Sequence, residues 1–157
     1  MITSMSYTYR KISKNDVPLL EQLLKIFGDA FNEVETYQKS PPSPAYLRSL
    51  LEKDTFVVVV AQDGATVVGG LAAYVLEKFE QERKEVYIYD LAVEQSHRRK
   101  GIATGLINEL KRIAKKLGAY IMFVQADLVD EPAVKLYESF GKGEDVLQFD
   151  IPVERDQ

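Results

Sequence analysis

Residues 89–105 read YDLAVEQSHRRKGIATG and connect an apolar strand to an amphipathic helix through a basic loop. The strand pattern covers 85–93, and the helix that follows is closed by Gly118. The first N–H groups of a helix and the positive end of its dipole attract anions. Gly101 and the small Ala103 leave room for a phosphate to approach the backbone. The stretch lacks the Walker and dinucleotide-binding patterns, so it predicts a different phosphate-binding strand–loop–helix unit.

The remaining sequence predicts further strands and helices around this unit. Before the unit we expect a first strand, a helix from Asn15 or Asp16 to near Asn32, and a helix beginning at Ser43 and Pro44. Strands over 55–62 and 66–76, joined by the turn Asp63-Gly64, follow these helices and precede the unit. After the unit we expect a strand over 119–126, a short helix from Asp130 or Glu131 through Phe140, and a final strand over 146–151. Continuous apolar sequence favours burial on both faces for 55–62 and 119–126.

These elements indicate an α+β fold, a single domain over residues 1–157 with a central mixed, mostly antiparallel sheet flanked by helices. The strands on either side of the phosphate-binding helix are expected to form a right-handed parallel crossover.

The composition excludes several kinds of chemistry. The chain has 157 residues, no cysteine and one histidine, His97. It therefore has no disulfide, no thiolate nucleophile and no cysteine-ligated metal centre, and we expect no metal. A Ser-His-Asp triad is disfavoured because Arg98 and Arg99 follow His97 and oppose an imidazolium. No apolar run is long enough to cross a bilayer and no signal-peptide core opens the sequence, so we expect a cytoplasmic protein without a membrane partner.

Charge is distributed unevenly along the chain. The net charge is −4, yet residues 97–116 hold seven Lys and Arg residues against one acid, Glu109. The simpler interpretation of any one of these residues is a solvated surface. The alternative is an anionic ligand at the basic segment and a cationic ligand at the acidic remainder. Nucleic-acid binding is not expected, because the chain as a whole is acidic.

Two motifs resemble the signatures of a known superfamily. The pattern Arg98-x-x-Gly101-x-Ala103 after the strand is similar to the acetyl-CoA motif of the GNAT N-acetyltransferases, and residues 133–141 are similar to their second signature. The sequence departs from the general pattern at Asp130, where many members have Asn, and at Lys142, where Phe is usual. The order of strands and helices also matches, so the resemblance implies a GNAT-type domain with acetyl-CoA as co-substrate.

A closer resemblance, spread over most of the chain, is to the short, GNAT-type aminoglycoside 3-N-acetyltransferases. It rests on residues 27–31, 35–37, 70–76, 78–81, 87–93, 125–127, 130–134 and 149–151. It implies direct acetyl transfer from acetyl-CoA to the 3-amino group of a deoxystreptamine antibiotic, and hence antibiotic resistance. The alternatives are a GNAT enzyme for another cationic amine, such as a polyamine or a protein lysine, and a non-catalytic acetyl-CoA-binding module. A homodimer also fits, since dimers are common in this superfamily.

The resemblance implies an acetyl-CoA site along the strand and the loop. The backbone of Leu91, Ala92 and Val93 would bind the pantetheine arm, with one N–H near the thioester carbonyl. The residues expected to hold the phosphates are Arg98, Arg99, Lys100, Gly101, Ile102, Ala103 and Thr104. Tyr137 would protonate the departing CoA sulfur, although a tyrosine that only packs in the core is the alternative.

Asp90 is the preferred acceptor of the proton that the amine loses. Simple alternation places Asp90 with Ile88 and Ala92, on the face opposite Tyr89 and Leu91. Apolar neighbours would raise the pKa of its carboxyl, which suits a base that works near neutrality. The alternatives are a carboxylate that caps a bulge or pairs with a lysine. A bulge would also change the face on which Asp90 lies.

The acidic surplus suits a polycationic acceptor such as an aminoglycoside. The residues expected to contact this substrate are Glu35, Tyr89, Asp127, Asp130, Glu131 and Asp150. Taken singly, each acid is better explained as a surface residue, and only the set as a whole favours a cationic acceptor. Tyr37, Tyr74 and Tyr89 have rings that can stack on sugar faces, and an ordinary role in the core explains them equally well.

Overall fold

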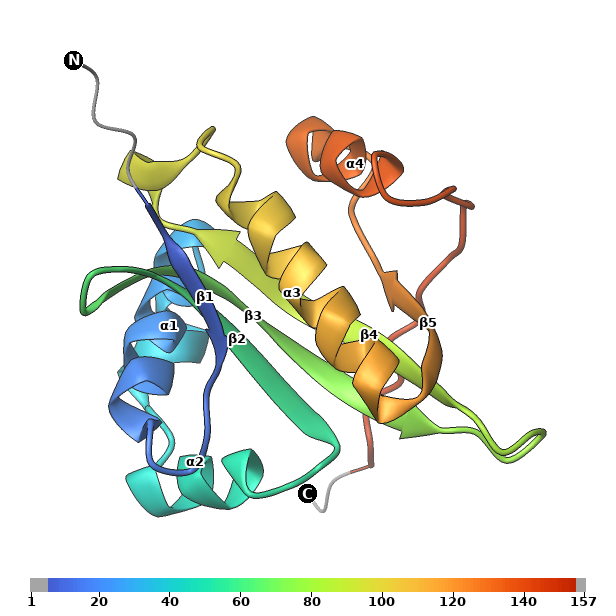
Figure 1. The fold of residues 1–157 in the computed structure, drawn as a ribbon, viewed down its shortest axis with the longest axis horizontal. Coiled ribbons are helices and arrows are strands. Elements are labelled where there is room, and N and C mark those ends of the chain that lie inside the picture. The colour runs from blue at the N-terminus through green and yellow to red at the C-terminus, as the bar shows by residue number, and fades with distance from the viewer. Residues whose placement is uncertain (1–5, 155–157) are drawn as a thin grey trace. The chain divides into compact units, whose positions relative to one another are not determined.

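Five strands form one sheet in the order β1-β2-β3-β4-β5 within residues 6–154, the part of the chain that the computed structural model describes (Figure 1). Their bounds are Thr8–Lys11, Phe56–Asp63, Thr66–Glu77, Lys84–Val93 and Ala119–Val124. Strands β1 to β4 pair antiparallel, whereas β4 and β5 pair in parallel through a helical crossover. The predicted α+β fold with a mixed, mostly antiparallel sheet is therefore confirmed.

The sheet belongs to the first of two compact units, residues 1–125, and the second unit is residues 126–157. The helices of the first unit are α1 (Val17–Ala30), α2 (Pro44–Leu51) and α3 (Ile102–Leu117), with a π-helical turn at Glu35–Lys39 and a 3-10 turn at Gln95–His97. No helix within residues 6–154 has both the length and the apolar character needed to cross a membrane.

Two apolar layers hold this unit together, one on each face of the sheet. Helix α3 packs on one face, and α1 and α2 pack on the other. Strand β2 lies between the layers, with Val57 and Val59 toward α3 and Val58 and Val60 toward α1 and α2. All four valines are fully buried, and each such side chain contributes roughly 1.5–3 kcal/mol of transfer free energy. This double burial explains the unbroken apolar sequence of β2.

Local sequence explains where the helices begin and end. Ser43 caps α2, because its Oγ accepts a hydrogen bond from the N–H of Tyr46 at 3.1 Å, and Pro44 fits the first turn. Gly118 ends α3 with a φ of 82°, in the left-handed region that glycine adopts without strain. Both ends are those predicted from the sequence.

Two details of the strands differ from the prediction. In the β2–β3 hairpin, Asp63 pairs with Thr66, so the turn residues are Gly64 and Ala65 rather than Asp63 and Gly64. Strand β5 is shorter than predicted, and its residues are exposed or half-buried rather than buried on both faces. The reason is that β5 lies at the edge of the sheet. An apolar run alone does not distinguish a central strand from an edge strand.

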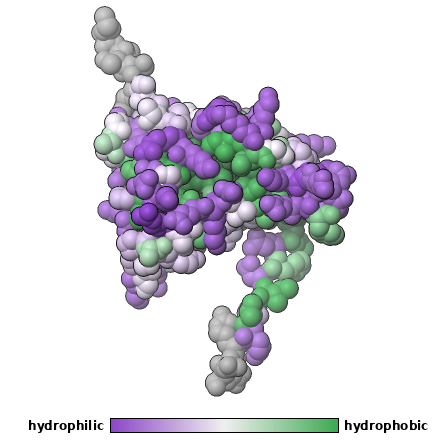
Figure 2. Space-filling model, turned by 60° about the horizontal axis from the view of Figure 1, so that its bottom comes forward, coloured by the Kyte–Doolittle hydropathy of each residue, from purple (hydrophilic) through white to green (hydrophobic). Residues whose placement is uncertain are grey.

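The second unit contains α4 (Glu131–Glu138), and here a predicted strand is missing. Asp130 caps α4, since its Oδ1 accepts a hydrogen bond from the N–H of Ala133 at 3.3 Å. The final strand expected over 146–151 does not form, because residues 142–154 have no ladder partner among the described residues. Alternating apolar side chains of this segment are exposed, and Figure 2 shows them as a green run that leads to the lower grey end. A strand pattern without a hydrogen-bonded neighbour does not make a strand.

Candidate active site

A β-bulge in the middle of β4 determines the face of the sheet on which Asp90 lies. Asp90 pairs with Ala72, but the next residue of β3, Ala73, pairs with Ile88, so Tyr89 is an extra residue in β4. Ile88 packs in the α3 layer, and Ala92 packs in the layer of α1 and α2. The bulge therefore corrects the predicted alternation: Asp90 shares a face with Ala92 but not with Ile88.

Asp90 is half-buried and its carboxylate is held by a phenol. The Oη of Tyr37 donates a hydrogen bond to Oδ2 of Asp90 over 3.0 Å. Burial raises the pKa of the Asp90 carboxyl above its ordinary value, the bond from Tyr37 lowers it, and the charge of Glu33 raises it further. The net increase brings this carboxylate closer to the range in which a general base works at neutral pH.

Tyr37 remains a hydrogen-bond donor because its own pKa is raised. Burial is the largest cause, followed by the neighbouring Asp90 carboxylate. Its ring contacts the rings of Phe27 and Phe31, with centroids 6.1 and 5.9 Å away. Tyr37 is thus fixed on both sides, by aromatic contacts with α1 and by the bond to β4.

Further tyrosines surround Asp90 on the same face. Tyr89 contacts the rings of Tyr74 and Tyr87, each with centroids 5.7 Å apart. Tyr74 and Tyr89 are 41% and 59% exposed, so their rings are open to a ligand. We call Tyr37, Tyr74, Tyr87 and Tyr89 the tyrosine patch. Exposed aromatic rings beside a carboxylate suit a ligand that has both apolar sugar faces and ammonium groups.

The basic loop has the backbone of an anion site. Gly101 is the N-cap residue of α3, with a φ of 79°, and no side chain caps the first turn. The first N–H groups of α3 thus lack the side-chain acceptor that a Ser or Asp cap would supply. Arg98, Arg99 and Lys100 are exposed beside it, and Arg99 also has a positive φ of 63°.

The structure adds a second reason for a glycine at position 101 to the predicted approach of a phosphate. A Cβ on Gly101 would have nothing within 4 Å, so the glycine is not needed for space within the chain. Its left-handed backbone is what other residues adopt only with strain. The glycine thus allows α3 to begin directly after the basic loop.

The end of β4 is open on one side. The ladder between β4 and β5 ends at the pair Ile88 and Val124, although β4 continues to Val93. Beyond Ile88, β4 therefore has β3 on one side and no strand on the other within the described residues. The Nε of Arg98 donates to the Val93 carbonyl over 3.2 Å and ties the loop to the strand end. Unpaired strand backbone leading to a helix N-terminus fits a long ligand that ends in phosphates.

The other predicted site residues lie in the π-helical turn or in the second unit. Glu35 is exposed and pairs with Lys39, with Nζ and Oε1 3.3 Å apart. Asp127, Asp130, Asp150 and Tyr137 belong to residues 126–157, where Asp130 caps α4 and Asp150 accepts a bond from Gln148 at 2.9 Å. Burial and the nearby Asp130 charge raise the pKa of Tyr137. Tyr137 therefore stays protonated at neutral pH and keeps a proton to donate.

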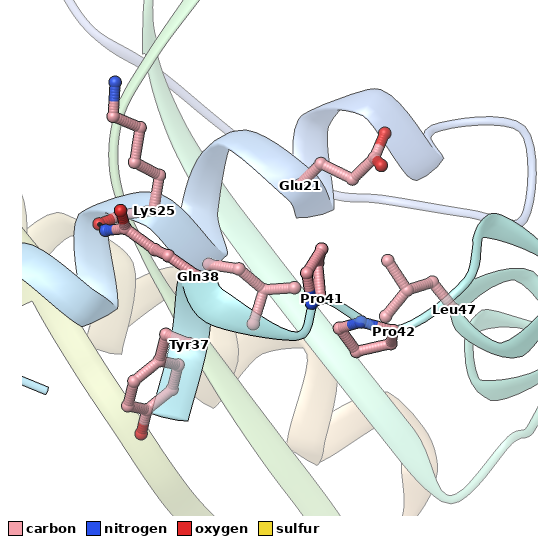
Figure 3. A pocket seen from close by; sticks show the side chains of 8 residues that line it. Glu21, Lys25, Tyr37, Gln38, Pro41, Pro42 and Leu47 are labelled. Atoms are coloured by element: carbon pink, nitrogen blue, oxygen red, sulfur yellow. Dashed lines mark hydrogen bonds between the residues drawn. The ribbon is translucent and has the colours of Figure 1, made fainter. Parts of the chain in front are cut away.

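Three residues around Tyr37 were not singled out by sequence reasoning. They are Gly28, Glu33 and Gln38, which come from α1 and from the segment that follows it. The connection between α1 and α2 also lines a small pocket of about 230 Å³, which Figure 3 shows with its side chains. The only signal in the sequence is that Gly28 falls within the family-like stretch 27–31. No group of three or more potential metal-ligating side chains occurs within residues 6–154.

Comparisons with known proteins agree with this geometry. The sequence model of the acetyltransferase (GNAT) family matches residues 20–142. The crystal structure of an aminoglycoside acetyltransferase, HMB0005, from an uncultured soil metagenomic sample is 54% identical over 96% of this chain and 100% of its own, with a TM-score of 0.93. The aminoglycoside acetyltransferase meta-AAC0020, also from an uncultured soil sample and solved with sisomicin, is 34% identical over 94% and 97%, with a TM-score of 0.87.

Curated sequences of known organisms are more distant. An uncharacterized N-acetyltransferase of Methanocaldococcus jannaschii is 27% identical over 139 residues, which are 87% of this chain. The chain spans 60% of the length of that relative.

Proposed function

The chain belongs to the GNAT acetyltransferase family, and from this premise we propose that it transfers an acetyl group from acetyl-CoA to an aminoglycoside, at the 3-amino group of the deoxystreptamine ring. One observation supports the acceptor class above all: an aminoglycoside acetyltransferase is 54% identical to this chain over nearly its whole length. The tyrosine patch around Asp90 adds a physical reason, because it offers aromatic faces and a carboxylate to a cationic sugar. We propose further that residues 1–157 act as one catalytic domain in the cytoplasm, with antibiotic resistance as the outcome.

Acetyl-CoA supplies an acetyl group activated as a thioester. The first N–H groups of α3, at Ile102, Ala103 and Thr104, would hold its pyrophosphate. The exposed cations Arg98, Arg99 and Lys100 attract the remaining phosphate. Leu91, Ala92 and Val93 lie on the open end of β4, and their backbone groups would bind the pantetheine arm and one would face the thioester carbonyl.

The acceptor amine needs to lose a proton as it forms the new C–N bond. Asp90 takes this proton, directly or through one water, on a carboxylate whose pKa burial has raised. As the C–S bond breaks, the sulfur gains a proton, and Tyr137 is the proposed donor. One proton leaves the amine and one reaches the sulfur, so the exchange balances.

Other side chains serve to attract and orient the acceptor. Tyr89 is exposed beside Asp90 and would stack on a sugar ring. The carboxylates of Glu35, Asp127, Asp130 and Asp150 add negative charge that attracts a polycation, with little contribution from any one of them.

The release of free thiol from acetyl-CoA tests the proposed function when it is measured against gentamicin, kanamycin, spermidine and a lysine-rich peptide. We expect fast turnover with gentamicin, and NMR of the product should place the acetyl group on the 3-amino nitrogen. Turnover only with spermidine or the peptide would contradict the acceptor class. Acetylation of gentamicin at another nitrogen would contradict only the regiochemistry.

A further inference from the structure

We propose that Tyr37 is a positioning residue for Asp90, and that Gly28 and Gln38 hold the turn that carries Tyr37 in place. This inference rests on the proposed function, in which Asp90 is the base. The Tyr37–Asp90 bond joins residues 53 apart in sequence, from the π-helical turn to the bulge of β4. It occupies Oδ2 of Asp90, and a carboxylate has a second oxygen that can accept the proton of the amine.

The turn is attached to α1 through the side chain of Gln38. The Nε2 of Gln38 donates to the carbonyl of Lys25 over 3.1 Å and to Oδ1 of Asp29 over 3.0 Å. Figure 3 shows Gln38 directed toward Lys25 while Tyr37 extends away from that helix. The two neighbouring residues therefore have separate tasks: Gln38 fixes the turn to α1, and Tyr37 reaches the sheet.

Gly28 makes this close approach feasible. A Cβ at position 28 would lie 2.8 Å from Nε2 of Gln38 and 3.1 Å from Cβ of Tyr37. The first contact would push the amide of Gln38 out of its hydrogen bonds to α1, and the second is tight enough that the backbone of the turn has to shift by a few tenths of an ångström. Glycine in the interior of a helix weakens that helix, and its presence in α1 is explained by the turn that packs on it.

An open space borders part of the turn. A pocket of about 230 Å³ lies between the turn, α1 and the start of α2, with Pro41, Pro42 and Leu47 in its lining (Figure 3). Because this space is open, packing does not fix the turn there. The position of Tyr37 depends on Gln38, on the fit at Gly28 and on its ring contacts with Phe27 and Phe31. Backbone hydrogen bonds from the N–H of Tyr37 to the carbonyl of Glu33 and from the N–H of Glu33 to the carbonyl of Gly28 also hold this segment.

The ionisable groups around Asp90 determine what the loss of the phenol does. They are Glu33 and Tyr37 from the segment after α1, Tyr74 from β3, and Tyr87 and Tyr89 from β4. Of these, the bond from Tyr37 is the influence that lowers the pKa of Asp90. Its removal therefore raises this pKa and leaves the carboxylate free to rotate away from the acceptor.

The test is the pH dependence of kcat/KM for gentamicin in the Tyr37→Phe variant. We expect the acid limb to move to higher pH by at least about half a unit and kcat to fall by about tenfold, with the KM for acetyl-CoA unchanged. Gln38→Ala, at a residue whose loss leaves the core intact, should change kcat and the acid limb in the same direction and by less. A Tyr37→Phe enzyme with the wild-type kcat and acid limb would overturn the proposal.

A matched control comes from Tyr120, whose phenol donates to Oε1 of Glu85 over 2.9 Å at the exposed edge of the sheet. Tyr120→Phe removes a phenol–carboxylate bond of the same kind and should leave kcat and the acid limb unchanged. An equal effect in Tyr120→Phe would show that loss of such a bond acts through general destabilisation, which would contradict positioning.

A second readout separates this proposal from the proposed function. The pKa of Asp90 can be followed by carbon-13 NMR of the carboxyl group in the protein without substrate. If the wild type acetylates no amine, the proposed function fails, and the titration still decides on Tyr37. A higher pKa in Tyr37→Phe than in the wild type supports positioning, and an unchanged pKa contradicts it.

Discussion

The loop at the start of α3 and the carboxylate in the bulge of β4 suit ligands of opposite charge, and they are constructed in different ways. The loop relies on backbone N–H groups within a short stretch, with Gly101 at its centre. The Asp90 site relies on side chains from α1, the π-helical turn, β3 and β4. A backbone site therefore depends on local conformation, whereas a side-chain site depends on strand register and on the packing of distant segments.

This difference predicts that substitutions will separate binding of acetyl-CoA from the chemical step. The largest effect is expected for Asp90→Asn, which removes the base and keeps the shape of the side chain. We expect kcat to fall by about 10²–10⁴-fold in a steady-state assay with gentamicin. The dissociation constant for CoA, measured by titration calorimetry, should stay at the wild-type value, because Asp90 contributes nothing to the loop. Weakened CoA binding in this variant would contradict the separation of the two sites.

A smaller effect is expected for Gly101→Val, which acts on the other region. Valine relaxes out of the left-handed conformation, and CoA binding has to restore it at a cost on the order of 1–3 kcal/mol. We expect the dissociation constant for CoA to rise by at least about tenfold in calorimetry. Gly118→Val is the matched control, because Gly118 has nearly the same φ, 82° against 79°, at the opposite end of α3. If both variants weaken CoA binding equally, the loop has no special role.

A still smaller effect should distinguish two acids that lie two residues apart in the segment after α1, Glu33 and Glu35. Glu33 raises the pKa of Asp90, so Glu33→Gln should lower that pKa and move the acid limb of kcat/KM to lower pH, by less than about half a unit. Glu35 is exposed and paired with Lys39, so Glu35→Gln should leave the acid limb in place. The two pH–rate profiles, measured side by side, check this difference. A larger movement with Glu35→Gln would indicate that the wrong acid has been assigned to the site.

The smallest effect concerns stability. The pKa of Asp90 is raised in the folded state, so folding disfavours the ionised carboxylate, and this loss of stability is present above the raised pKa and absent below the unfolded value. Asn carries no charge and can still accept the bond from Tyr37. We expect Asp90→Asn to raise the Tm by about 1–2 °C at pH 7, and this gain should shrink as the pH falls toward about 4. Thermal unfolding across this pH range provides the measurement. A lower Tm in the variant at pH 7 would contradict the conclusion that burial of the ionised Asp90 carboxylate destabilises the fold.

The two regions also differed in how far the sequence predicted them. The strand, the basic turn and the helix start lie where they were predicted, because they form one continuous pattern, and the binding of phosphate there stays a prediction. Even there, the conformational reason for Gly101 followed only from its φ of 79°, and the predicted close approach of a phosphate stays a prediction.

The Asp90 site was predicted less completely. Period-two alternation has no means of locating an extra residue, so the bulge at Tyr89 changed the face of Asp90 relative to Ile88. The π-helical turn was not predicted either. Because this turn carries Tyr37, the contact between Tyr37 and Asp90 was not predicted. From the sequence alone, Gly28 only lowers the stability of the predicted helix, and its role is evident only once the turn that packs on it is known.

In the proposed mechanism, the loop binds acetyl-CoA and Asp90 removes the proton of the amine. The most direct test of this separation is the single-turnover rate of acetyl transfer to gentamicin at saturating acetyl-CoA, in the wild type, Gly101→Val and Asp90→Asn. We expect Gly101→Val to react at nearly the wild-type rate once it is saturated, because its defect lies in binding. Asp90→Asn should react at least about 100-fold more slowly, because its defect lies in proton removal. An Asp90→Asn enzyme that transfers acetyl at the wild-type rate would contradict the assignment of Asp90 as the base.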